Sequence, residues 1–319
     1  MNSVRFLWLL LWVLLAHYSG GVAQSFSEKE VRIKTNGGYL YGSYCLPSQV
    51  SQTPIALIIA GSGPTDRNGN NILAGENNAL KMLAVALAEH KIATLRFDKR
   101  GLGKSAKMLT DESKLTFDQM VWDAEACLKW MKKQKIHNRV WVIGHSEGSL
   151  IGMLAAHRSQ ADGFVSLAGP GQRASNLLRT QLAQQPETIR DEAYRILDSL
   201  DKGVQVTTIS TILNPLFRTS VQPYLISWFA YDPCEEIRRL NIPVLVIQGD
   251  ADLQVKVWDG ERLSLCNLNS KLSVISNLNH VLKELDNKVN MGENISTYGD
   301  PQKPISSRLI SEIVNIIKP

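Results

Sequence analysis

The pentapeptide Gly144-His145-Ser146-Glu147-Gly148 has the residue types that nucleophilic catalysis by a serine requires. It follows an apolar run at 140–143, which predicts a buried strand, and it precedes a helical pattern at 147–157. A serine raised on a sharp strand-to-helix turn needs glycine two residues away on either side, because larger side chains would collide there. The start of the helix would direct backbone N–H groups at a developing oxyanion. The alternative is a glycine-rich turn whose serine only caps the helix.

A serine hydroxyl is a weak nucleophile and needs a general base. Of the six histidines, only His280 lies in the C-terminal half, in a loop after the apolar run at 272–275. His145 belongs to the serine turn itself and is expected to point away from the hydroxyl. The other four lie in the N-terminal apolar segment, at helix ends or before a strand: His17, His90, His137 and His157. We therefore predict that His280 is the base, although a single loop histidine is more often structural.

The base needs a carboxylate that fixes its tautomer and stabilises the imidazolium. Two candidates, Asp250 and Asp252, follow the apolar run at 244–248. Asp252 lies further from the strand end, where a loop can bring it toward the histidine, whereas Asp250 could brace the turn. We favour Asp252, which gives the chain order Ser146, Asp252, His280.

The rest of the chain alternates predicted strands with predicted helices. Short apolar runs predict strands at 31–34, 39–45, 55–60, 92–97, 140–143, 164–167, 244–248 and 272–275. Helical spacing predicts helices at 78–90, 116–133, 147–157 and 308–317. This alternation indicates an α/β fold: a mostly parallel central sheet with helices on both faces, preceded by an antiparallel hairpin. Residues 170–236 interrupt the pattern with helix-like pieces, and we interpret them as a helical cap inserted in a core of residues 24–169 and 237–319.

Two further motifs lie between the predicted strands: Ala60-Gly61-Ser62-Gly63-Pro64, and the turn at 98–105, which reads Asp-Lys-Arg-Gly-Leu-Gly-Lys-Ser. Together with the serine turn, and in this order, they resemble the α/β-hydrolase superfamily over about residues 30–318. In finer detail the chain is similar to exported bacterial esterase-type hydrolases that carry a Gly-Ser-Gly-Pro-Thr-Asp-Arg segment. The resemblance implies the α/β-hydrolase fold and a serine esterase with a cap over its site.

The resemblance also implies where the oxyanion hole lies. Many members of the superfamily have His-Gly where this chain has Ala60-Gly61. One donor maps to the backbone N–H of Ser62, and the other to that of Glu147, directly after the nucleophile. A main-chain donor survives a change of side chain, so we expect the hole to persist.

Three residues are candidates for binding the substrate. Arg67 lies in a polar loop at the expected mouth of the site and could bind an anionic group, or could equally form a brace within its loop. Arg100 is not counted among them, because we expect it to hold the 98–105 turn together rather than to touch the substrate. Tyr224 and Trp228, in the aromatic stretch of the cap, could line an acyl pocket, or could form ordinary core.

The composition excludes several other classes. Apolar residues make up 44% and charged residues 20% of 319 residues, which is typical of a globular protein. The 35 basic and 30 acidic residues form no long basic run, so nucleic-acid binding has no support. The four cysteines form no CxxC pair, and the predicted chemistry needs no metal or organic cofactor. Sequence alone does not pair the cysteines and does not indicate an oligomeric state.

The first 23 residues have the pattern of a secretory signal. Arg5 precedes the apolar run at 6–16, which is too short to span a bilayer, and Gly21-Val22-Ala23 would suit cleavage. An uncleaved anchor is the alternative. We expect an exported protein, periplasmic or extracellular, with no membrane span after signal removal. Asn294-Ile295-Ser296 is a glycosylation sequon that matters only in a eukaryotic source.

These observations predict an exported serine hydrolase that cleaves small carboxylic esters through an acyl-enzyme. A serine peptidase or aminopeptidase, or an acyltransferase, would use the same three residues. The alternative of a different class is a catalytically silent binding module on a hydrolase scaffold.

Overall fold

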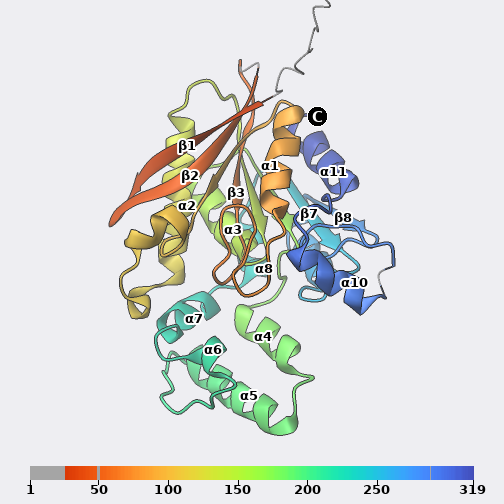
Figure 1. The fold of residues 1–319 in the computed structure, drawn as a ribbon. Helices are drawn as coiled ribbons and strands as arrows, with labels where there is room; N and C mark the ends of the chain where they lie inside the picture. Colours follow the sequence, from red (N-terminus) through yellow and green to blue (C-terminus); the bar gives the residue numbers. More distant parts are fainter. Residues whose placement is uncertain (1–25, 49–50, 288) are drawn as a thin grey trace, which may run out of the picture.

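A computed structural model describes residues 26–319 except 49, 50 and 288; the predicted signal segment lies outside this range. Its centre is a sheet of eight strands in the order β1-β2-β4-β3-β5-β6-β7-β8 (Figure 1). The strands are β1 (Phe26–Thr35), β2 (Gly38–Pro47), β3 (Ile55–Ile59), β4 (Ala93–Phe97), β5 (Val140–His145), β6 (Gly163–Leu167), β7 (Val244–Gly249) and β8 (Ser270–Ile275). β2 is antiparallel to both β1 and β4, and all other pairs are parallel. This is the predicted mostly parallel sheet with an antiparallel hairpin at its edge.

Helices cover both faces of the sheet, so the inner strands are apolar on both sides. Leu57 and Val142 belong to the cluster beneath α2 (Phe117–Lys132) and α3 (Glu147–Ser159). Ile58 and Ile143 belong to the cluster beneath α1 (Ala79–Glu89) and α11 (Ser307–Ile317). The side chains of each strand therefore alternate between two cores.

The interruption between β6 and β7 is helical, as predicted. It contains α4 (Ala174–Leu182), α5 (Glu187–Asp201), α6 (Asn214–Phe217) and α7 (Gln222–Phe229), which lie together beyond the carboxyl ends of the parallel strands (Figure 1). The aromatic stretch forms α7, with Pro223 in its first turn, where a missing N–H costs nothing. The last helix of the predicted insertion, α8 (Pro233–Arg238), packs instead against α3 and α9 (Val257–Cys266) of the main body.

Both ends of this insertion are attached to α9. Before α4, the Gly171 N–H donates a hydrogen bond to Asp259 Oδ1 at 2.9 Å. After α7, Cys234 on α8 forms a disulfide with Cys266 at the end of α9. The remaining cysteines, Cys45 and Cys127, are buried thiols.

The other elements are short. They are the 3-10 helices η1 (Gly103–Met108), η2 (Glu112–Lys114) and η3 (Thr297–Gly299), and α10 (Met291–Ser296). In the part of the chain that the structure describes, we find no helix with the length and hydropathy of a membrane span.

Candidate active site

Ser146 occupies the sharp turn between β5 and α3. Its backbone has φ 55° and ψ −123°, a conformation that non-glycine residues rarely adopt. A Cβ on Gly144 would lie 2.2 Å from the carbonyl oxygen of Gly148, and a Cβ on Gly148 would lie 2.5 Å from that of Ile59. The packing of backbone against backbone therefore requires both glycines. The Ser146 side chain lines a cavity at this edge of the sheet.

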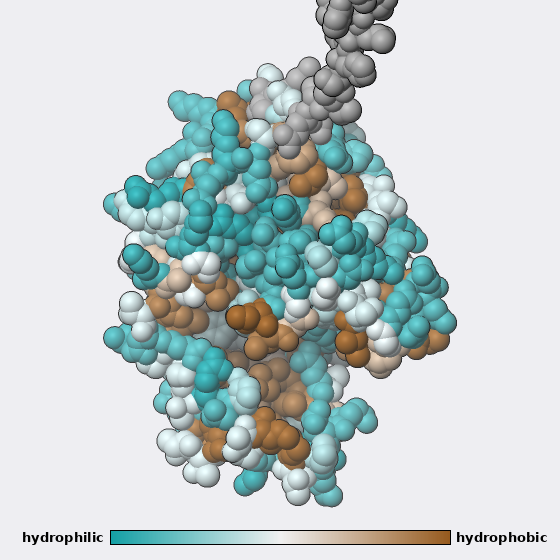
Figure 2. All heavy atoms as spheres, in the orientation of Figure 1, coloured by the Kyte–Doolittle hydropathy of each residue, from teal (hydrophilic) through white to brown (hydrophobic). Residues whose placement is uncertain are grey.

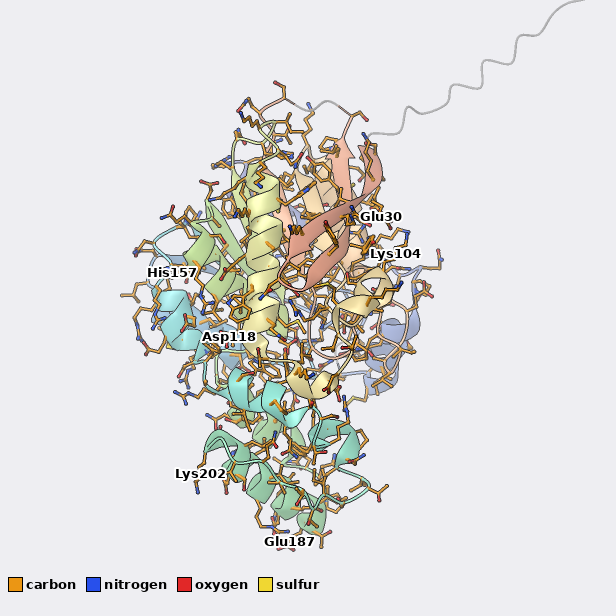
Figure 3. The ribbon with its side chains drawn as sticks, turned by 90° about the vertical axis from the view of Figure 1, so that its left-hand side faces the viewer. Glu30, Lys104, Asp118, His157, Glu187 and Lys202 are labelled. Atoms are coloured by element: carbon orange, nitrogen blue, oxygen red, sulfur yellow. A yellow bond between two sulfur atoms is a disulfide. The ribbon has the colours of Figure 1, made fainter. Side chains whose placement is uncertain are left out.

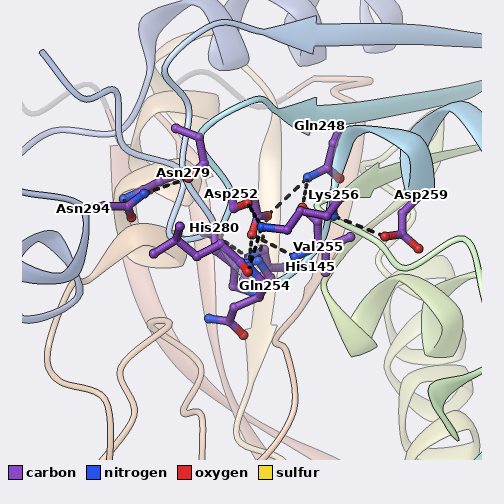
Figure 4. A network of polar contacts seen from close by, with 12 residues as sticks. His145, Gln248, Asp252, Gln254, Val255, Lys256, Asp259, Asn279, His280 and Asn294 are labelled. Atoms are coloured by element: carbon purple, nitrogen blue, oxygen red, sulfur yellow. Dashed lines mark hydrogen bonds and ion pairs between the residues drawn. The ribbon is translucent and has the colours of Figure 1, made fainter. Parts of the chain in front are cut away.

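Asp252 and His280 form a buried pair, shown in Figure 4. Asp252 Oδ2 accepts a hydrogen bond from His280 Nδ1 at 2.8 Å and a weaker one from Gln248 Nε2 at 3.2 Å. Its Oδ1 accepts from the N–H groups of Gln254 at 2.8 Å and Val255 at 3.0 Å. Burial alone would raise the pKa of Asp252, but His280 and the two N–H donors outweigh it and the pKa is lowered. The carboxylate is thus held ionised against the imidazole.

Asp250 lies in a different position. Its Oδ1 accepts a hydrogen bond from the N–H of Asn277 at 2.6 Å, which fixes the start of the loop that carries His280. This is the bracing role that we considered for it from the sequence. The geometry thus pairs Asp252 with His280, while Asp250 is bonded to the turn.

His145 links the serine turn to the His280 loop. Its Nε2 donates a hydrogen bond to the backbone carbonyl of His280 at 2.8 Å, and the two ring centroids are 4.9 Å apart. His280 therefore lies beside the turn that carries Ser146. Burial, followed by the nearby charge of His280, lowers the pKa of His145 to about 4, so it is a neutral donor.

This burial predicts a pH-dependent loss of stability. The folded-state pKa of His145 lies below its value of about 6.5 in the unfolded chain, so its contribution is complete above pH 6.5 and is lost as pH falls toward 4. Between pH 7 and pH 5 the loss from this group is about 2 kcal/mol. Denaturant unfolding of wild type and His145→Gln at both pH values should show a smaller loss in the variant. Replacing the exposed His157 by Gln should leave the wild-type loss unchanged; an equal effect of both variants would contradict the assignment.

Buried amides hold the His280 loop in place. Asn279 Nδ2 donates to Thr297 Oγ1 at 2.6 Å and to Asn294 Oδ1 at 3.2 Å, and Asn294 Nδ2 donates to the carbonyl of Ala251 at 2.7 Å. Asn294 is only 1% exposed, so the sequon that contains it is closed to glycosylation in the folded protein. Its structural role could not be recognised from the sequence.

The expected oxyanion donors belong to residues beside Ser146. Gly61 lies so close to Ser146 that a Cβ on it would come within 3.1 Å of the serine Cβ. Ser62 and Glu147 line the same cavity as Ser146. The segment 60–64 and the start of α3 thus both lie beside Ser146.

The cavity lies between the sheet edge and the cap helices and has a volume of about 500 Å³. On the face drawn in Figure 2, apolar side chains gather where the cap meets the main body. Tyr224 and Trp228 both line the cavity and also belong to the hydrophobic core beneath the cap, so the acyl-pocket role stays a prediction. Its other apolar walls include Leu109, Leu115, Met120, Leu177, Leu178, Leu216, Val221, Leu225 and Val255.

Arg67 does not line this cavity, and the structure corrects its candidacy as a substrate-binding residue. Its guanidinium forms a bidentate ion pair with Asp98, with N···O distances of 2.8 and 2.6 Å, and also reaches Ser43. The positive charge of Arg67 is therefore neutralised by Asp98 within the protein. Arg100, which also lines the cavity, is likewise bidentate to Asp123 on α2, with both distances 2.7 Å, so it ties the 98–105 turn to a helix of the main body rather than holding the turn together internally.

Sequence reasoning missed Lys99, whose side chain is buried beside the segment 60–64 and also lines the cavity. Lys99 Nζ donates to the carbonyls of Gly61 at 2.5 Å and Gly63 at 2.8 Å and lies 4.0 Å from Glu147 Oε2. Glu147 Oε1 in turn accepts a 2.6 Å hydrogen bond from the hydroxyl of Tyr224. Burial lowers the pKa of Lys99 and raises that of Glu147, and each charge opposes the shift of the other. Among the described residues, no cluster of three or more histidine, cysteine or acidic side chains is placed to hold a metal ion.

A mostly parallel sheet with a serine on a strained strand-to-helix turn, and a carboxylate–histidine pair beside it, defines an α/β hydrolase. A family model described as serine aminopeptidase, S33, matches residues 73–208. Over 307 residues the chain is 30% identical to esterase EstD of Thermotoga maritima, covering 91% of this chain and 67% of EstD. The chain therefore belongs to the α/β-hydrolase superfamily and to its esterase type.

Solved structures agree on the fold. Est1E from Butyrivibrio proteoclasticus, solved with ferulic acid bound, has a TM-score of 0.60 and 18% identity, covering 90% of this chain and 96% of Est1E. The Pyrococcus furiosus esterase Pf2001 has a TM-score of 0.57 and 19% identity, covering 92% of this chain and 91% of Pf2001. These likenesses confirm the α/β-hydrolase fold predicted from the sequence.

Proposed function

We propose that the protein hydrolyses carboxylic esters through an acyl-enzyme formed on Ser146. The hydroxyl of Ser146 attacks the ester carbonyl while His280 Nε2 takes its proton, which gives a tetrahedral oxyanion. Collapse of this intermediate breaks the bond to the alcohol oxygen, and His280 delivers the proton to the leaving alcohol. Water then attacks the acyl-enzyme with His280 again as base, which releases the acid and restores the serine.

The remaining groups act on charge and orientation. Asp252 holds the proton on Nδ1 of His280, so that Nε2 is free to accept the serine proton, and it stabilises the imidazolium. The N–H groups of Ser62 and Glu147 bind the oxyanion. The observation that carries the proposal is the position of His280. Its ring is bonded to Asp252 at 2.8 Å, and its backbone carbonyl is bonded to His145, the neighbour of Ser146.

The cavity supports a compact, uncharged acyl group. Its apolar walls are leucine, valine and aromatic side chains from both the cap and the main body, and the volume of about 500 Å³ is in the usual range for small-molecule sites. Esters with short to medium acyl chains fit this description. We also propose that the protein is exported; the signal-like first 23 residues and the Cys234–Cys266 disulfide, a bond typical of oxidising compartments, support this.

Aminopeptidase activity is the second candidate, because the description of the matching family model names it. An aminopeptidase needs an unpaired carboxylate that holds the substrate ammonium. Among the described residues that line the cavity, the carboxylates are Glu112 and Glu147. Glu112 is bonded to Arg218 and Glu147 is paired with Lys99, so both negative charges already have a partner. The site therefore favours esters.

A fluorophosphonate probe and a substrate panel test the proposal on purified wild-type protein. We expect the probe to label one serine, found by mass spectrometry in the peptide that contains Ser146. Hydrolysis of p-nitrophenyl esters should exceed that of aminoacyl anilides by at least about 100-fold in kcat/KM, since neither lining carboxylate is free. Folded protein without label would indicate a binding module. Preference for the anilides would indicate a peptidase.

A further inference from the structure

A buried polar cluster connects the cap to the segment expected to form the oxyanion hole. Lys99 Nζ donates to Gly61 O at 2.5 Å, and this carbonyl belongs to the same peptide group as the N–H of Ser62. In a trans peptide the C=O and N–H point in opposite directions. The hydrogen bond from the Lys99 ammonium to the Gly61 carbonyl oxygen therefore fixes the direction of the Ser62 N–H. It also polarises the peptide, which strengthens this N–H as a donor.

The second expected donor is tied to the same ammonium. The Glu147 side chain lies 4.0 Å from Lys99 Nζ, while the Glu147 backbone supplies the other N–H of the hole. The side chains of Lys99 and Glu147 are 5% and 3% exposed, so their pairing is not weakened by water. One buried ion pair at the wall of the cavity thus braces both expected donors.

The cap completes the cluster. Tyr224 on α7 donates its hydroxyl proton to Glu147 Oε1 at 2.6 Å, and the tyrosine is also buried. Its ring lies 6.1 Å from that of Phe117 on α2, which is stacked against Trp228 of the same cap helix. Packing of α7 on the main body therefore fixes where this hydroxyl meets the carboxylate.

We propose that Tyr224 and Lys99 are positioning residues of the oxyanion hole, through which the docked cap sets the direction of the Ser62 N–H. This inference rests on the proposed function, because the hole matters only if Ser146 attacks a carbonyl. The competing interpretation is that Tyr224 and Glu147 only neutralise a buried lysine. Only the positioning role predicts that loss of the Tyr224 hydroxyl weakens binding of the oxyanion in the transition state.

The main test compares Tyr224→Phe with Tyr231→Phe. Tyr231 also joins the cap to a carboxylate of the main body, with its hydroxyl 2.5 Å from Asp118 at the start of α2, labelled in Figure 3. Both variants remove one hydroxyl–carboxylate bond between cap and body, but only Tyr224 is bonded to Glu147, the residue whose backbone N–H is an expected oxyanion donor. We expect Tyr224→Phe to lower kcat for a p-nitrophenyl ester about 10-fold with KM changed less than about twofold. Tyr231→Phe should leave both parameters within about twofold of wild type.

A pair of ketone inhibitors reports on the hole directly. A trifluoromethyl ketone adds to the serine and places an oxyanion in the hole, whereas the methyl ketone with the same acyl chain binds without forming this adduct. Tyr224→Phe should weaken the trifluoromethyl ketone about 10-fold and leave the methyl ketone unchanged. Equal weakening of both ketones, or no difference between the two tyrosine variants, would overturn the proposal.

A charge-balanced double variant separates positioning from neutralisation. Lys99→Met alone leaves the buried Glu147 without a counter-charge and is expected to impair folding. Lys99→Met combined with Glu147→Gln removes both charges and should restore the folded protein. We expect this folded double variant to keep a kcat about 100-fold below wild type, because nothing then holds the Gly61 carbonyl. Full recovery of kcat would show that the lysine is only neutralised.

The wild-type assays distinguish a failure of this inference from a failure of the proposed function. If wild type neither reacts with the fluorophosphonate nor hydrolyses esters, the proposed function fails. If wild type is active while Tyr224→Phe and Tyr231→Phe behave alike, only the positioning role fails.

Discussion

Replacement of Ser146 by alanine is expected to lower kcat for p-nitrophenyl esters by about 10⁶-fold and to abolish labelling by the fluorophosphonate. In the proposed mechanism, the variant keeps the base and the oxyanion donors but has no oxygen that can be acylated. Water must then attack the ester directly, so the remaining catalysis comes only from binding and from the hole. Initial rates at saturating ester, measured on enzyme freed of trace contaminants, check this expectation.

The fold should survive the Ser146→Ala change. Alanine is smaller than serine, and the Ser146 N–H bond to the carbonyl of Leu167 is made by the backbone. The thermal midpoint should therefore remain within a few degrees of wild type. The affinity for the methyl ketone should also be retained. Activity within about 100-fold of wild type in the purified variant would place the nucleophile elsewhere.

Replacement of Asp252 by asparagine is expected to lower kcat by about 10⁴-fold near neutral pH. The asparagine amide can donate to Nδ1 of His280, which favours the tautomer with the proton on Nε2, where it blocks transfer from the serine. The lost charge also removes stabilisation of the imidazolium. Since the pKa of Asp252 is lowered, the wild-type carboxylate remains charged on mild acidification, and this group causes no loss of activity there.

Asp250→Asn is the matched control for Asp252→Asn. Both aspartates follow β7, but Asp250 accepts its 2.6 Å hydrogen bond from the backbone of Asn277. Asparagine keeps an oxygen that can accept this bond, so we expect kcat to fall by less than about 10-fold. Parallel kcat measurements on both variants decide the assignment. A larger loss in Asp250→Asn than in Asp252→Asn would reverse the roles of the two carboxylates.

The parts of the site that could be predicted are those encoded by short segments. The serine turn needs glycines at fixed spacing around Ser146, and the structure shows the backbone contacts that impose this. The loops bearing Asp252 and His280 follow apolar strands, and the carboxyl ends of parallel strands meet at one edge of a sheet. The fold could be predicted because its apolar strands and amphipathic helices are also visible in short segments. Few folds can bury strands and helices that alternate in this way.

The parts that could not be predicted depend on pairing between distant segments. Arg67 could be assigned to a brace or to a substrate until its partner, Asp98, was placed beside it. In the sequence, Lys99 looks like an ordinary charged residue of a turn. The neighbouring residues do not indicate that its ammonium is buried against the Gly61 carbonyl. The pairing of Cys234 with Cys266 likewise depends on how α8 packs against α9. Such contacts are properties of the tertiary structure, which a local pattern does not contain.

The attachment of the insertion to α9 has a consequence for how such a protein can diversify. Asp259 holds the chain before the first cap helix and Cys266 holds it after the last, so both anchor points lie on one short rigid helix. Exchange of the segment 174–229, which holds four helices, for another helical segment would keep both anchor points, although it would remove the hydrogen bond from Gln181 to the carbonyl of Gln254 beside Asp252. A chimaera made in this way should acquire the acyl preference of the donor while keeping the hydrolytic chemistry, provided that the transplanted helix carries a tyrosine where Tyr224 now meets Glu147.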